Sequence, residues 1–287
     1  MTEGRTATPL LVWRQIKYQN TLFWRTPVAA FFTLAFPLMF LILFNLLFDE
    51  RIEIEGRDPL TIAQFYAPAL AAFAAASATY TNIGVGQAIA RDDKILKRFR
   101  STPLPPWMYM AGVVGSAIWL AFIATVLMIS VGVFAYGLEI YVDRLPAALV
   151  TFAVGVTAFA ALGLALAAIS PTGDTAPAVA NATLLPIAFI SNVFVPITDP
   201  APWLAFLGDF FPLKHFVVPL QDAFNPFVTD SAFRGGDLLV MALWGIAGIA
   251  FSLKFFSWEP RTESGGRRRR RAKSEDSSYR PELSVSD

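Results

Sequence analysis

The 287-residue sequence contains no cysteine and only one histidine, His215. The absence of thiols excludes disulfide frameworks, thiolate metal sites and cysteine nucleophiles, and a single histidine argues against a histidine-based metal cluster. Charged residues are also scarce, at 16% of the chain against about 25% in a typical soluble domain. The sequence therefore lacks the surface-forming residues of an ordinary soluble globular protein.

Apolar residues, in contrast, make up 55% of the chain, and the mean hydropathy is +0.52. Six apolar runs contain no Asp, Glu, Lys or Arg, and we interpret them as membrane spans. They lie at residues 27–48, within 61–90, within 107–137, at 146–170, at 177–196 and at 238–253. The sequence predicts an all-α membrane protein with six transmembrane helices over residues 27–258, a cytoplasmic segment 1–26 and a tail 259–287.

Lysine and arginine are distributed unequally between the two sides of the predicted membrane domain. With six spans both termini lie on one side, and that side carries 18 of the 23 Lys and Arg residues. Because short basic loops stay in the cytoplasm, we expect a multi-pass protein of the plasma membrane with both termini cytoplasmic.

Residues 8–25, before the first span, have an amphipathic helical pattern. Its apolar side consists of Val12, Trp13, Ile16, Phe23 and Trp24, and Arg14 and Arg25 lie roughly opposite. A basic helix with tryptophans suits the inner membrane interface. The alternative is a simple basic anchor for the first span.

The tail contains five consecutive arginines, Arg267 to Arg271, and few apolar residues that can pack. We therefore expect residues 259–287 to be disordered. Such a cluster beside a span is suited to anionic lipid headgroups, and the alternative is an orientation signal alone. No nucleic acid is expected as a partner, because no aromatic or folded module accompanies the arginines.

Motifs for chemistry are missing from the sequence. It contains neither a Gly-x-x-x-x-Gly-Lys-Ser/Thr loop nor a Gly-x-Ser-x-Gly elbow, so we expect no ATP hydrolysis by this chain and no cofactor in it. The predicted spans offer only neutral polar side chains such as Asn45, Asn82, Gln87, Asn181 and Asn192. These are typical of helix–helix contacts, and the lack of ionisable groups disfavours coupling to a proton gradient. Energy for any transport would then come from a partner.

The inner loop between the second and third spans has the pattern of a short helix. Asp92 and Asp93 precede it, and Lys97, Arg98 and Arg100 lie at its end, an order that complements the helix dipole. Ile95, Leu96 and Phe99 form a small apolar stripe on the same segment. A displayed helix of this kind is suited to docking in a protein groove. From the residues alone, a solvated charge run beside the membrane is an equal alternative.

Two segments resemble a known family, the type-2 ATP-binding-cassette (ABC) permeases, which are the exporter class. The first is the string Leu96-Lys97-Arg98-Phe99-Arg100-Ser101-Thr102-Pro103-Leu104. The second is Ile190-Ser191-Asn192-Val193-Phe194-Val195-Pro196, followed by Pro202-Trp203 and by Phe211 to His215. The resemblance covers about residues 8–258 and implies an N-terminal connecting helix, a cytoplasmic coupling helix and a re-entrant helical segment on the outer side after the fifth span.

The resemblance also implies partners and site residues. Such a permease pairs with a second permease half, identical or related, and with a cytoplasmic ABC ATPase that binds ATP-Mg. The ATPase contact would comprise Arg91, Asp92, Asp93, Ile95, Leu96, Lys97, Arg98, Phe99 and Arg100. The substrate path would pass Tyr66, Tyr80, Asn82, Phe189 and Asn192, for which ordinary helix packing is the alternative role.

By this resemblance the chain exports a drug, lipid or other amphipathic molecule. Two other functions stay open: a gradient-driven transporter or channel, which would work without an ATPase, and a membrane scaffold, which would bind a partner without nucleotide-dependent flux.

Overall fold

The computed structural model describes residues 3–48, 51–52, 60–102, 104–197, 200–228 and 233–258. The predicted arginine-rich tail, residues 259–287, lies outside the described residues. The described chain is almost entirely helical, which confirms the predicted all-α class. Its helices are α1 (Glu3–Trp24), α2 (Pro27–Ala30), the π-helical η1 (Phe31–Ala35), α3 (Phe36–Leu47), α4 (Ile62–Asp92), α5 (Ile95–Arg100), α6 (Pro106–Tyr136), the 3-10 helix η2 (Val142–Arg144), α7 (Leu145–Ile169), α8 (Ala176–Phe189), α9 (Pro202–Phe210), α10 (Pro212–Ala223) and α11 (Gly235–Phe255). Two short strands, β1 (Arg51–Ile52) and β2 (Leu60–Thr61), pair antiparallel before α4.

Helix α4 is the centre of the bundle. It contacts α3, α6, α7, α8 and α10, while α11 packs on α7 and α1 packs on α6. Thr61 and Gln64 start α4 with a reciprocal capping box. The most apolar stretch of α4 is 100% buried, against 17% for the first span and 22% for α11. The least apolar of the spanning helices is therefore the one that protein encloses, which suits its polar side chains.

Small residues let the neighbouring helices approach α4 closely. A Cβ atom added at Gly163 of α7 would lie 2.8 Å from the carbonyl oxygens of Thr79 and Tyr80. One added at Gly84 would meet the side chain of Leu166 at 2.3 Å. Close backbone approach at small residues is the usual basis of helix association in membranes, where lipid offers no hydrophobic drive.

The first span runs through α2, η1 and α3 as one segment, Pro27–Leu47. Its widened turn at Phe31–Ala35 directly precedes Pro37. Proline lacks an N–H and its ring clashes with the carbonyl four residues earlier, so a wider turn accommodates it.

Five helical segments in the described residues are long and apolar enough to cross a membrane: Pro27–Leu47, Ile62–Asp92, Pro106–Tyr136, Val142–Ile169 and Gly235–Phe255. The fifth predicted run forms only the 14-residue α8, which ends at Phe189 rather than at Pro196. Residues 190–197 turn instead, and Asn192 adopts a left-handed conformation with φ of 58°. Six spans therefore remain a prediction.

The segment predicted to be re-entrant forms the two helices α9 and α10. Leu213, Phe216, Val217 and Leu220 of α10 are buried, and α10 packs against α4, α7 and α11. Insertion of these helices into the bilayer stays a prediction.

Helix α1 packs on α6 with only part of its predicted apolar side. Gln15 and Ile16 of α1 fill the space beside Gly112 and Gly115 of α6. Trp13 and Trp24 are 63% and 51% exposed, so they point away from the protein. Ile16 of the predicted apolar side and the polar Gln15 therefore make the contact, and the two tryptophans do not.

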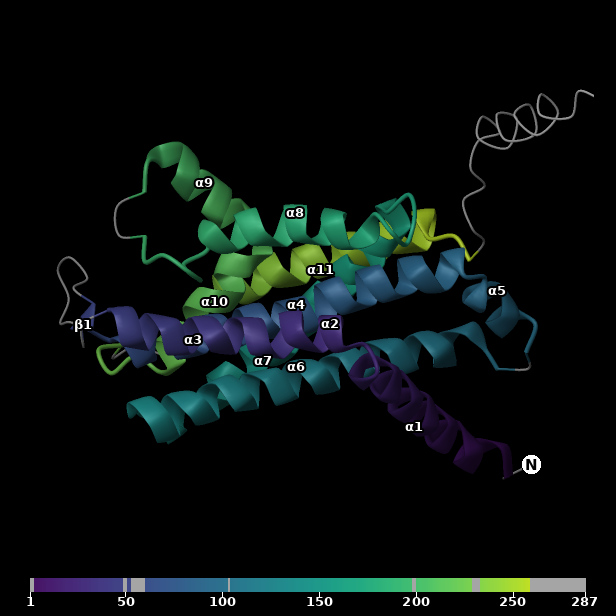
Figure 1. The fold of residues 1–287 in the computed structure, drawn as a ribbon, viewed down its shortest axis with the longest axis horizontal. Coiled ribbons are helices and arrows are strands. Elements are labelled where there is room, and N and C mark those ends of the chain that lie inside the picture. Colours follow the sequence, from purple (N-terminus) through teal and green to yellow (C-terminus); the bar gives the residue numbers. More distant parts are fainter. Residues whose placement is uncertain are drawn as a thin grey trace, which may run out of the picture.

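The bundle has two distinct ends (Figure 1). Helix α5 lies at one end, and the N-terminal part of α1 and the last turns of α11 point toward that same end. Strand β1 and helix α9 lie toward the opposite end. We refer to these as the α5 end and the α9 end.

Candidate functional site

The candidate site is the turn from α4 into α5. Helix α4 continues to Asp92, and Asp93 closes it with a hydrogen bond from its N–H to the Ile89 carbonyl (2.9 Å). Lys94 then adopts a left-handed conformation, with φ of 60° and ψ of 17°. This single residue reverses the chain, since a left-handed residue is a common way to end a helix.

The predicted helix exists, but the structure begins it at Ile95, after the acidic pair. Helix α5 has six residues, and two hydroxyl groups hold its end. Ser101 Oγ donates to the Arg98 carbonyl (2.8 Å), and Thr102 Oγ1 donates to the Phe99 carbonyl (2.7 Å). Asp92 and Asp93 precede α5 as predicted, but Asp92 is the last residue of α4, Asp93 is its C-cap, and Lys94 is the N-cap of α5.

Two residues of the apolar stripe of α5, Leu96 and Phe99, pack against the protein, whereas Ile95 is exposed. Leu96 is 0% exposed and belongs to a cluster with Ile83, Tyr109 and Val113. The ring of Phe99 lies 4.6 Å from that of Tyr109, centroid to centroid. Leu96 is therefore not free to anchor a partner, contrary to the sequence-based expectation. Its burial fixes α5 against the start of α6.

The other predicted contact residues of α5 are accessible. Asp93, Lys94, Lys97 and Arg98 are exposed, and Ile95 is 38% exposed. The side chain of Arg100 lies outside the described part of the chain. We call the surface made by Lys94, Ile95, Lys97 and Arg98 the outer face of α5.

Arg91 is buried, although its charge suggested a docking role. Its side chain is 1% exposed and caps the end of α7. Nη1 donates to the Ala167 carbonyl (3.0 Å), and Nη2 donates to the carbonyls of Ser170 (2.9 Å) and Pro171 (3.3 Å). The last carbonyls of a helix have no partner within the helix and carry partial negative charge, which explains why a buried guanidinium is stable here.

Asp92 completes this connection. Its Oδ1 atom accepts from Arg91 Nε (3.2 Å), and its Oδ2 atom accepts from the backbone N–H of Gly173 (2.6 Å). A Cβ atom at Gly173 would lie 2.8 Å from the Cα atom of Ile89, so only glycine fits here. Arg91 and Asp92 thus clamp α4 to the end of α7 and to the loop before α8. We call this arrangement the inner clamp.

The residues predicted for the substrate path mostly make contacts between helices. Tyr66 donates to the Phe194 carbonyl (3.3 Å), and the hydroxyl groups of Tyr80 and Thr183 lie 2.8 Å apart. Asn82 Nδ2 donates to Thr33 Oγ1 (3.2 Å), and Asn192 Oδ1 accepts from the Ile197 N–H (3.3 Å). Phe189 is exposed, with its ring 5.1 Å from that of Phe194. These residues are spread along α4 and α8 and do not converge on one site.

At the α9 end, polar contacts join the short helices to α7 and α11. Arg144 donates to the carbonyls of Asn225 and Val228, just after α10. His215 Nδ1 lies 2.5 Å from Asp237 Oδ1 of α11, and Nε2 lies 2.7 Å from the Asp209 carbonyl. The hydrogen bond to Asp237 raises the pKa of His215 above its ordinary value. Two helix ends, one at each end of the bundle, are therefore capped by an arginine from another element.

Sequence analysis did not identify the inner clamp, because a basic residue beside a span is usually interpreted as an orientation signal. Its burial depends on α7, which lies far away in the sequence. In the described part of the chain, no group of three or more His, Asp or Glu side chains is placed to hold a metal ion.

Comparison with known proteins identifies the family of the chain. The sequence model of the ABC-2 type transporter family matches residues 6–225, which is more than half of the chain. No curated protein matches the chain. The matched region includes α4, α5 and the inner clamp, together with the spans that surround them. The chain belongs to the ABC-2 type transporter family and is a membrane permease subunit of an ABC transporter.

Proposed function

We propose that the chain exports an amphipathic molecule from the cytoplasm, driven by ATP hydrolysed on a separate ABC ATPase subunit. The observation that carries this proposal is the arrangement of α5. The helix stands beyond the end of α4 with its apolar side fixed to α6 and its basic outer face free. An ATPase subunit that binds this face can move the bundle without first having to order α5.

The inner clamp gives the movement a route into the membrane domain. A force on α5 reaches α6 through Leu96 and the contact of Phe99 with Tyr109. It reaches α7 and the loop before α8 through Arg91 and Asp92. Because these contacts are buried and hydrogen-bonded, the connected helix ends respond together and do not yield one by one.

We further propose that α8 makes the sixth crossing. Its 14 residues span about 21 Å, less than the hydrocarbon core of about 30 Å. The irregular residues that follow would complete the passage. Irregular backbone is tolerated at membrane depth where protein covers it, and Ser191, Val193 and Phe194 are buried. Both termini would then lie on the cytoplasmic side, together with α5.

A second permease half would cover α8. Its outward side carries the small residues Ala178, Asn181 and Ala182, all of which are exposed. Small residues are typical of helix contacts in membranes, so we propose this side of α8 as part of the interface between the halves. The cargo path would lie between the two permease halves. Because the apolar runs that form the spans contain no Asp, Glu, Lys or Arg, we propose a cargo without strong charge.

Affinity purification of the chain from its native host tests the ATPase partner. The informative variant reverses two charges on the outer face of α5, Lys97→Glu with Arg98→Glu. We expect the bound ATPase to fall about tenfold or more, because two complementary charges are reversed. The matched control is Arg14→Glu with Lys17→Glu, which makes the same charge change on exposed positions of α1 and should retain the ATPase.

Each outcome distinguishes the three functions. An ATPase that is retained by the control and lost by the α5 variant supports the exporter. Flux that needs an ion gradient and no ATPase would identify a gradient-driven transporter. A bound partner with no nucleotide-dependent flux in proteoliposomes would identify a scaffold.

A further inference from the structure

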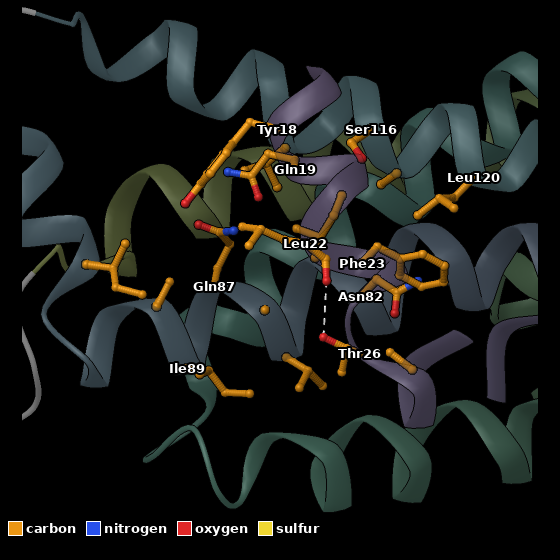
Figure 2. Close-up of a pocket in the computed structure, with 18 of the residues that line it drawn as sticks. Tyr18, Gln19, Leu22, Phe23, Thr26, Asn82, Gln87, Ile89, Ser116 and Leu120 are labelled. Carbon is orange, nitrogen blue, oxygen red and sulfur yellow. Dashed lines mark hydrogen bonds between the residues drawn. The ribbon is translucent and has the colours of Figure 1, made fainter. Parts of the chain in front are cut away.

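A cavity of about 370 Å³ lies where α1 crosses α4 and α6 (Figure 2). Helix α1 contributes Leu22 and Phe23, and α6 contributes Val113 and Leu120. Ile95 and Phe99 of α5 line the end nearest the candidate site. The volume is within the range of pockets that hold small ligands, about 300 to 1,000 Å³. The cavity is separate from the predicted substrate path, with which it shares only Asn82.

The lining is neutral. None of the residues that line this cavity is an aspartate, glutamate, lysine, arginine or histidine. A charged ligand that entered this cavity would lose its hydration without gaining a counter-charge, which is strongly unfavourable. The chemistry of the walls therefore selects a neutral molecule with a large apolar part.

A polar side-chain atom that points into the cavity, Gln87 Oε1, lacks a hydrogen-bond donor within the described part of the chain. Gln87 is 4% exposed, and its Oε1 atom has no hydrogen-bond partner among the described residues. Figure 2 shows the side chains of Tyr18, Gln19 and Gln87 converging on the same part of the cavity. Buried acceptors are normally hydrogen-bonded, so a hydroxyl or amide donor on a ligand would satisfy this one.

The backbone also leaves room for an occupant. Gly86 lines the cavity, and a Cβ atom added there would meet no atom within 4 Å. This contrasts with Gly84, two residues earlier, where an added Cβ atom collides with Leu166. Because Gly86 is exposed, a larger side chain at position 86 would stand at the open edge of the cavity without disturbing the helix contacts.

We propose that this cavity binds a neutral amphiphile, with a donor headgroup at Gln87 and an apolar chain between Leu22, Val113 and Leu120. A neutral membrane lipid and the exported cargo share this chemistry. Because Ile95 and Phe99 line the cavity, an occupant would also brace α5 at its base. Only this last consequence rests on the proposed function, since binding itself needs no ATPase.

The test is photo-crosslinking of the full chain in nanodiscs with a diazirine-bearing monoacylglycerol. We expect saturable labelling of peptides from residues 18–29 and 82–90, competed by unlabelled monoacylglycerol. Gly86→Leu should abolish the saturable part. Gly236→Leu is the matched control, because position 236 is also open but lies at the start of α11. It should label like the wild type.

A second variant removes the acceptor and keeps the volume. Gln87→Leu should weaken competition about tenfold, the effect of one lost hydrogen bond. Monodisperse elution checks that each variant is folded. If Gly86→Leu does not fold, the result for Gln87→Leu decides the test. Labelling that never saturates and is equal in all variants would overturn the proposal, because it would come from bulk lipid at the protein surface.

The source of the ligand is decided with the ATPase present. A cargo would leave the cavity and appear in the opposite compartment when ATP is added, whereas a structural lipid would stay bound through turnover. If no ATPase is found, the proposed export fails, while saturable labelling would still establish the cavity as a binding site.

Discussion

At the scale of single residues, Arg91 shows how burial changes the role of a charge. Its guanidinium donates to three carbonyls at the end of α7 and to the neighbouring Asp92, so most of its hydrogen bonds serve the contact between helices. Lysine has the same charge but lacks the planar fork, so it cannot reproduce these contacts.

We expect Arg91→Ala to lower the free energy of unfolding by about 3 kcal/mol, because it leaves the carbonyls of Ala167, Ser170 and Pro171 without this donor and the half-buried Asp92 without its ion pair. Arg91→Lys should retain only part of the free energy of unfolding that Arg91→Ala loses. Arg14→Ala, at an exposed position, should change it by less than about 0.5 kcal/mol. Denaturant unfolding in detergent, followed by tryptophan fluorescence, measures all three. Equal stability of Arg91→Ala and Arg14→Ala would contradict the inner clamp.

At the scale of elements, the contact of α10 with α11 includes one titratable pair. His215 of α10 faces Asp237 of α11, and Asp209, Lys214, Asp222 and Arg234 are the other charged groups around this contact. Protonated His215 donates to Asp237 and to the Asp209 carbonyl, so the charged form is favoured in the folded state.

Because the folded pKa of His215 is raised, its stabilising effect is complete below the unfolded pKa of 6.5 and is lost as the pH rises through the folded pKa. We expect the thermal unfolding midpoint of the wild type to decrease as the pH is raised from 6 to 9. His215→Gln should lower the midpoint at pH 6 and flatten this dependence. A variant whose pH dependence equals that of the wild type would rule out this pair as the cause.

The elements also show which predictions from sequence were reliable. Five of the six apolar runs correspond to spanning helices with ends within a few residues of those predicted, because an uncharged run of this length has few alternatives to a helix. The apolar stripe of α5 was predicted correctly as a pattern but assigned to the wrong partner. Periodicity identifies an apolar face, and it does not say whether the partner is another chain or the same one.

At the scale of the whole molecule, the side on which each loop lies can be measured directly. The chain has no cysteine, so single introduced cysteines report without background. We expect a membrane-impermeant maleimide added outside whole cells to label Asp143→Cys and Ala201→Cys and not Ser101→Cys, all at exposed positions. Lysed cells, in which all three should react, are the control.

Ala201 is the critical position, because it follows α8. Its labelling together with Asp143 requires that α8 and residues 190–197 cross the membrane. Protection of Ala201 from outside, together with Ser101, would show that the chain has five crossings and that the termini lie on opposite sides.

The sequence by itself determined that the protein is a membrane protein, its helical class and its family. Those depend on local quantities: the length and charge of apolar runs, and a short string of residues around Leu96 to Leu104. The tertiary structure alone decided which side chains are available. It buried Leu96 and Arg91, left Lys97 and Arg98 free, and opened a neutral cavity at Gln87. These outcomes depend on where α6 and α7 pack against α4, and such contacts between distant segments leave no mark in a local pattern.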